Sequence, residues 1–95
     1  MSDLTVEEFV AKAIEDREFM RQVAQNSTDV DLQADNGLVT AFHTAAKRMG
    51  HTYDFNELGM TVTTKIKSLG AFGVIKFARA FNKAHNKAIK NADKS

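Results

Sequence analysis

The last third of the chain carries basic residues at the spacing of one face of an α-helix. On a helical wheel, with about 100° per residue, they fall within a sector of about 80° and are Lys76, Arg79, Lys83, Lys87, Lys90 and Lys94. The opposite side holds Val74, Phe77, Ala78, Phe81, Ala84, His85, Ala88 and Ala92. This pattern predicts a basic amphipathic helix of about twenty residues.

Two shorter helices are predicted at the start of the chain. Thr5 and Glu8 have the spacing of a capping box, in which each side chain accepts a backbone N–H at the helix start. The apolar residues that follow recur on one helical face and are Val6, Phe9, Val10, Ala13 and Ile14. Asp16 interrupts this helix and suits the N-cap of a second one, which Asn26, Ser27 and Thr28 end.

Two further helices are predicted after a polar, acidic loop over residues 26–37. The first spans about residues 38–49 and stops at Gly50. A second capping box then opens a short helix that ends at Gly59. Residues 60–69 alternate like a strand, but a single strand would have no partner, so we expect a helix start or a linker.

The fold class that follows is all-α. Because the chain has no proline, its five glycines are the only strong helix breakers. We therefore expect a small bundle of three to four short helices followed by the longer basic helix.

Charge divides the chain into two regions. Residues 1–59 hold 5 Lys/Arg and 11 Asp/Glu, which gives −6, and residues 60–95 hold 8 Lys/Arg and 1 acid, which gives +7. We interpret residues 1–59 as an acidic helical domain and residues 60–95 as a basic amphipathic C-terminal helix. The alternative is that the basic helix folds back onto the acidic body and the charges pair.

Several kinds of site are excluded or disfavoured by the residues present. Without cysteine there are no disulfides and no Cys-zinc sites. His43, His51 and His85 are not spaced as metal ligands, and Gly70 to Gly73 lack the Lys and Ser/Thr of a phosphate-binding loop. We therefore predict a non-enzymatic protein with no cofactor and no metal.

The basic helix admits three interpretations. It is a solvated face of a folded domain, a helix that binds an anionic membrane surface through residues 72–95, or a nucleic-acid-binding element. Nucleic acid is the weakest of the three, because lysine predominates over the Arg, Asn and Gln that address base edges. The acidic N-terminus is unlike a secretory signal peptide, so we expect a cytoplasmic protein.

Residues 4–58 resemble the Nif11-like leader family, which precedes ribosomally made, post-translationally modified peptides. The resemblance rests on the order and spacing of a few residues: Phe9, Asp16, Phe19, Ala45-Ala46, Gly50, Tyr53 and Glu57-Leu58. It departs from the family in the longer, more acidic loop over residues 26–37.

The resemblance implies a peptide precursor whose leader is recognised by a modifying enzyme or a peptidase-exporter. Gly70-Ala71 would be the cleavage site, and residues 72–95 the cationic payload. Partner-binding residues would be Phe9, Ile14, Asp16, Phe19, Phe42 and Tyr53, unless these side chains simply form the core.

The alternative function is a small helical inhibitor or adaptor that binds a partner protein. The two hypotheses differ in where Phe77 and Phe81 lie. If these rings sit at the centre of the bundle, with no exposed seam between the two regions, a single-core binding domain is the better interpretation.

Overall fold

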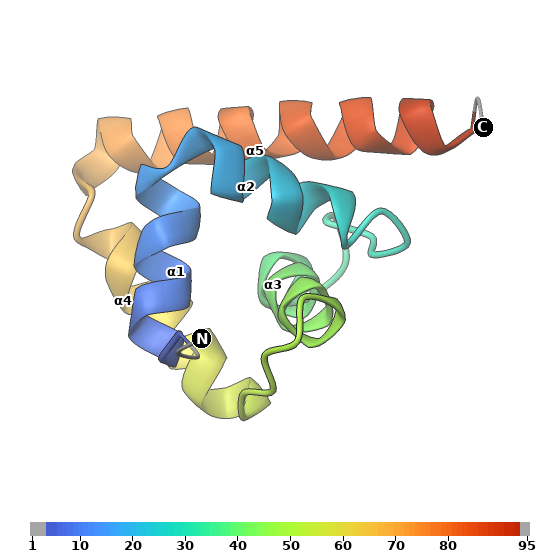
Figure 1. Ribbon diagram of the computed structural model, residues 1–95. Coiled ribbons are helices and arrows are strands. Elements are labelled where there is room, and N and C mark those ends of the chain that lie inside the picture. The colour runs from blue at the N-terminus through green and yellow to red at the C-terminus, as the bar shows by residue number, and fades with distance from the viewer. Residues whose placement is uncertain (1–3, 94–95) are drawn as a thin grey trace.

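The computed structural model describes residues 4–93, which form five α-helices and no strand. The helices are α1 (Val6–Glu15), α2 (Arg17–Gln25), α3 (Gly37–Arg48), α4 (Phe55–Lys67) and α5 (Gly70–Asp93), arranged as Figure 1 shows. The predicted all-α class is confirmed. Lys94, assigned to the basic face from the sequence, lies outside the described residues.

The helix ends follow the local chemistry expected of them. Thr5 and Glu8 form the capping box, with the Thr5 N–H donating to Glu8 Oε1 at 2.9 Å, and these hydrogen bonds lower the pKa of Glu8. Asp16 caps α2 by accepting from the N–H groups of Glu18 and Phe19. Gly50, at φ +92°, ends α3 in the left-handed conformation that glycine adopts without strain.

Helix α4 is longer than predicted. The helix expected to end at Gly59 continues to Lys67, so residues 60–67 are neither a strand nor a linker. Leu58 and Val62 are buried one turn apart, and Ile66 packs beside them one turn later. Burial of this stripe outweighs the low helix propensity of Gly59.

One hydrophobic core joins the acidic and basic halves of the chain. The Phe42 ring lies at its centre, with centroid distances of 6.4 Å to Phe9 and to Phe77, and of 5.6 Å to Phe81. Phe77 is 7% exposed and Phe81 is 1% exposed. The basic C-terminal helix therefore belongs to the same core as the acidic half, and the boundary expected after Gly59 falls within α4.

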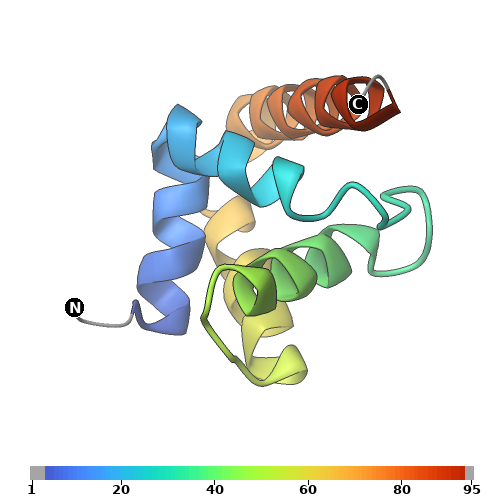
Figure 2. The ribbon, with the colours of Figure 1, turned by 45° about the vertical axis from the view of Figure 1, so that its right-hand side comes forward.

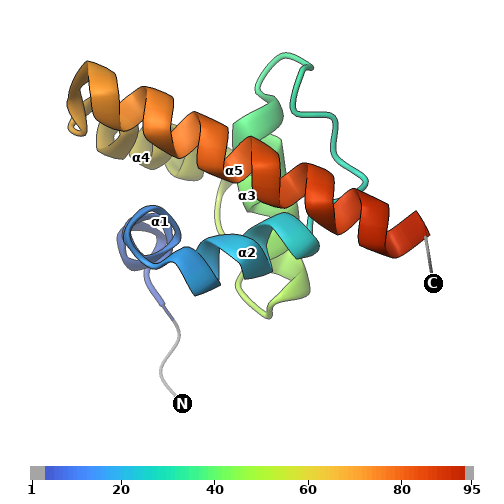
Figure 3. The same cartoon turned by 90° about the horizontal axis from the view of Figure 1, so that it is seen from above.

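Helix α5 lies across one side of the molecule. It packs along α2 and, near its start, against α4, and Figures 1 and 3 show its C-terminal end running past the end of α2. Figure 2 shows α3 on the opposite side of the core from α5, and α4 running from beside α3 toward the start of α5. The long helix thus presents one face to the core and the other to solvent.

Candidate binding surface on α5

The basic residues of α5 form an exposed band. All five described members of the predicted basic face are exposed: Lys76, Arg79, Lys83, Lys87 and Lys90. Residues 58–92 also contain Lys65 and Lys67 but no acid. In the described part of the chain, the ion pairs are Arg21–Glu18 at 3.5 Å and Arg48–Asp29 at 2.7 Å. The basic helix folds back onto the body, but its cations form no ion pair with the body's acids in these described residues.

Apolar side chains are exposed at the corner where α4 turns into α5. Leu69 is 37% exposed, Phe72 is 85% exposed and Ile75 is 49% exposed. Gly70 makes this corner at φ +77°, a conformation that an L-residue with a side chain rarely adopts. We call Leu69, Phe72 and Ile75 the apolar corner; it lies where yellow gives way to orange in Figure 1.

A cationic groove runs between α2 and α5. Its rim carries Arg17 and Arg21 from α2 and Lys83 and Lys87 from α5, and its floor is formed by Met20, Ala80 and Ala84. The central part has a volume of about 330 Å³. Two neighbouring hollows that share lining residues with the central part extend it to Lys76 at one end and to Asn91 at the other. We call this feature the α2–α5 groove.

Arg17 and Arg21 are functional candidates that the sequence analysis missed. They belong to the half of the chain with net charge −6, which obscures them when charge is summed by region. Their spacing of four residues places both on the same exposed face of α2. That spacing is a detectable feature, although only the packing of α2 against α5 brings the arginines beside the lysines.

Most predicted partner-binding residues are structural in this fold. Phe9 and Phe42 are fully buried and Phe19 is 8% exposed, so these rings belong to the core and do not offer a surface to a partner. Asp16 is the N-cap of α2. The Tyr53 hydroxyl donates to the Leu4 carbonyl oxygen at 2.6 Å.

Ile14 and the predicted cleavage site are accessible. Ile14 is half-buried and lines the end of the α2–α5 groove near Lys76. Gly70 and Ala71 are exposed and form the first turn of α5. The structure therefore separates the predicted site residues into core, cap and surface positions and does not gather them into one site.

The histidines hold segments of the fold together. His43 Nε2 lies 3.1 Å from the Tyr53 carbonyl oxygen, and His85 Nε2 lies 2.8 Å from that of Ser27. The His51 ring is stacked on Tyr53. Within residues 4–93, no three His, Asp or Glu side chains come together as a metal site.

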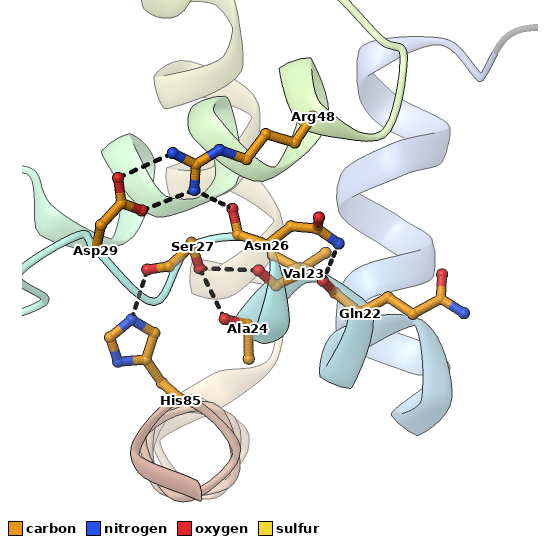
Figure 4. Close-up of polar contacts among 8 residues, drawn as sticks. All are labelled: Gln22, Val23, Ala24, Asn26, Ser27, Asp29, Arg48 and His85. Carbon is orange, nitrogen blue, oxygen red and sulfur yellow. Dashed lines mark hydrogen bonds and ion pairs between the residues drawn. The ribbon is translucent and has the colours of Figure 1, made fainter. Parts of the chain in front are cut away.

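A bidentate ion pair holds the start of the acidic loop to the end of α3. Arg48 donates to both carboxylate oxygens of Asp29, at 2.7 and 2.9 Å, and to the Asn26 carbonyl oxygen (Figure 4). The hydrogen bond from Arg48 is the main reason why the pKa of Asp29 falls to about 2. This loop is thereby anchored although it contains no helix.

No protein-family model, curated protein or solved structure matches this chain. The resemblance to the Nif11-like leader family therefore stays a prediction. The residues that carry it help to build the fold: Phe9 and Phe19 lie in the core, Asp16 caps a helix and Gly50 ends one. None of the helices in residues 4–93 combines the length and apolar composition needed to cross a membrane.

Proposed function

We propose that this protein is a non-catalytic binding protein that attaches to anionic lipid membranes through the exposed side of α5. The observation that carries the proposal is Phe72, which is 85% exposed beside a cationic band. An exposed aromatic ring next to lysines matches the chemistry of the lipid interface, where the ring enters the acyl boundary and the ammonium groups contact headgroup phosphates.

The mode of attachment is limited by the fold. A free amphipathic helix inserts its whole apolar face, but Phe77 and Phe81 of α5 are occupied by the core. The apolar corner is the exposed apolar surface left for insertion, so only the start of α5 would enter the membrane interface. Each Lys or Arg near an anionic surface contributes about 1 kcal/mol at most, which makes the attachment reversible and sensitive to salt.

Vesicle sedimentation tests this proposal. Binding is expected to vesicles of phosphatidylserine and phosphatidylcholine, and not to phosphatidylcholine alone. Phe72→Ser should weaken binding by about tenfold to a hundredfold, because losing the transfer of a Phe side chain costs about 1.5–3 kcal/mol. Met60, 72% exposed on α4, gives the matched control, and Met60→Ser should bind as the wild type does. Equal binding to both vesicle types, or no effect of Phe72→Ser, would refute membrane attachment.

A peptide precursor of the Nif11-like kind is a second candidate. Exposure of Gly70 and Ala71 at the corner between α4 and α5 favours it, because a peptidase needs access to the backbone. Cleavage there would remove Phe77 and Phe81 from the core, so release of the payload would destabilise the remaining leader. Mass spectrometry of the native protein separates the two candidates: a fragment ending at Ala71 supports the precursor, and an intact chain supports the binding protein.

A further inference from the structure

We infer that the α2–α5 groove is a docking site for an acidic amphipathic helix of a partner protein. The groove shares Lys83 and Lys87 with the cationic band and Leu69 with the apolar corner, but Phe72, which carries the proposal of membrane attachment, does not line it. Together the two sites would make the protein an adaptor, which holds a partner helix at one face of α5 and a membrane at its start.

The charge of the groove specifies an anionic occupant. Arg17, Arg21, Lys83 and Lys87 line its central part, and no acid lines that part with them. Arg21 makes an exposed contact of 3.5 Å with Glu18, while the two lysines have no ion-pair partner among the described residues. Four like charges held together, with an ion-pair contact in the described residues only at Arg21, favour an occupant that supplies carboxylates.

The floor of the groove specifies that the occupant is also apolar on one side. Met20 is 6% exposed, and Ala80 and Ala84 are half-buried. A single anion would leave this floor bare, whereas a helix with an apolar stripe covers it and points its flanking carboxylates at both rims. Recognition of a helix by a hydrophobic groove between charged rims is a common mode of peptide binding.

The length of the groove sets the size of the occupant. Along α5 it extends from Lys76 to Asn91, which corresponds to about 22 Å at about 1.5 Å per residue. A partner helix of about fifteen residues, or four turns, would fill it. Glu15 lies at the end near Lys76 and is the one acid that lines the groove along its described length, so the partner's charge should concentrate toward the other end.

Fluorescence anisotropy with a designed peptide tests the inference. The probe is an 18-residue labelled helix with leucines on one face and glutamates on both flanks, and its control is a scrambled peptide of the same composition. At 150 mM salt, saturable binding of the helix at least tenfold tighter than the scrambled peptide is expected. Equal binding of the two peptides would overturn the inference, because it would show only nonspecific charge attraction.

Variants of the protein locate the site. Arg17→Glu with Lys87→Glu should weaken peptide binding at least tenfold. Lys47→Glu with Lys67→Glu changes the net charge equally, outside the groove, and should alter it less than threefold because distant charges are screened at this salt concentration. If Arg17→Glu with Lys87→Glu unfolds the protein, the milder variant Arg17→Gln with Lys87→Gln is used instead. Loss of binding in the control variant to the same degree would refute the site.

Two further measurements distinguish peptide binding in the groove from membrane binding and from nucleic-acid binding. Phe72→Ser should leave peptide binding unchanged, so failure of membrane attachment and failure of groove binding are distinguishable. A 16-base-pair DNA duplex serves as competitor, because a cationic helix also suits phosphates. Weak displacement of the bound peptide by the duplex supports a protein partner. If the duplex displaces the peptide at a duplex concentration below the peptide concentration, nucleic acid is the better ligand and the inference is overturned.

Discussion

His85 of α5 donates from Nε2 to the backbone carbonyl oxygen of Ser27, which lies 58 residues earlier in the chain, over a distance of 2.8 Å (Figure 4). Both residues are buried. The Ser27 hydroxyl in turn donates to the Val23 carbonyl oxygen at 2.8 Å. This polar pair therefore fixes the end of α2 against the middle of α5, beside the aromatic core.

Replacing His85 should destabilise the protein. His85→Ala removes one of the two hydrogen bonds that the Ser27 carbonyl oxygen accepts, because the Val30 N–H still donates to it at 3.0 Å. Loss of one such hydrogen bond costs about 0.5–1.5 kcal/mol. Asn86→Ala, one residue away and exposed, is the matched control and should change the free energy of unfolding by less than about 0.5 kcal/mol. Urea denaturation measures both; equal stability of the two variants would contradict a structural role for His85.

Truncating Phe81 tests whether the chain has one core. Phe81→Ala should cost about 3–5 kcal/mol, the range for removing a buried Phe, and unfolding should remain a single transition when it is followed by circular dichroism and by tyrosine fluorescence. Tyr53 lies in the acidic half, so its fluorescence reports on that part. Two separate transitions, with the tyrosine transition unmoved by the substitution, would show instead that the acidic half folds on its own.

Two helical glycines should respond oppositely to alanine. A Cβ at Gly37 would lie 2.6 Å from the Asp31 carbonyl oxygen and 2.7 Å from that of Leu32, so Gly37→Ala must displace backbone and should cost at least about 1–3 kcal/mol. A Cβ at Gly59 would lie 3.4 Å from the Val39 side chain, which is ordinary contact. Gly59→Ala should be neutral or stabilise by up to about 1 kcal/mol through helix propensity. Thermal melts of both variants check this; similar melting temperatures would be incompatible with the close packing at Gly37.

Acid should reduce the contribution of the Arg48–Asp29 pair to the free energy of unfolding within a defined pH window. The folded-state pKa of Asp29 is about 2, below the value of about 3.9 for an unfolded Asp. The pair therefore contributes fully above pH 4, and its contribution is lost as the pH falls through 4 toward 2, since the unfolded chain takes up the proton first. The difference in free energy of unfolding between wild type and Asp29→Asn should shrink over this window.

The acidic loop offers a control for that titration. Gln33 is exposed in the same loop and carries no charge, so Gln33→Ala should keep the wild-type dependence of stability on pH between 4 and 2. A constant difference between wild type and Asp29→Asn across the window would mean that Arg48 does not hold the Asp29 carboxylate in the folded state.

The sequence by itself determined the helices whose ends are set locally. Thr5 with Glu8, Asp16 and Gly50 each act through hydrogen bonds or backbone conformation within a few residues, so their roles follow from spacing alone. The basic face of α5 was predictable for the same reason, because helical periodicity places Lys76 to Lys90 on one side before any tertiary contact forms.

The tertiary structure alone decided what α4 and α5 do. Gly59 ends a helix by local propensity, yet burial of Leu58 and Val62 carries α4 past it, because tertiary packing contributes more than one residue's propensity. Whether Phe81 faces a core or a membrane is likewise invisible in the sequence, since an apolar face suits either. Packing against Phe42 settles that choice, and the same packing brings Arg17 and Arg21 beside Lys83 and Lys87 to form the α2–α5 groove.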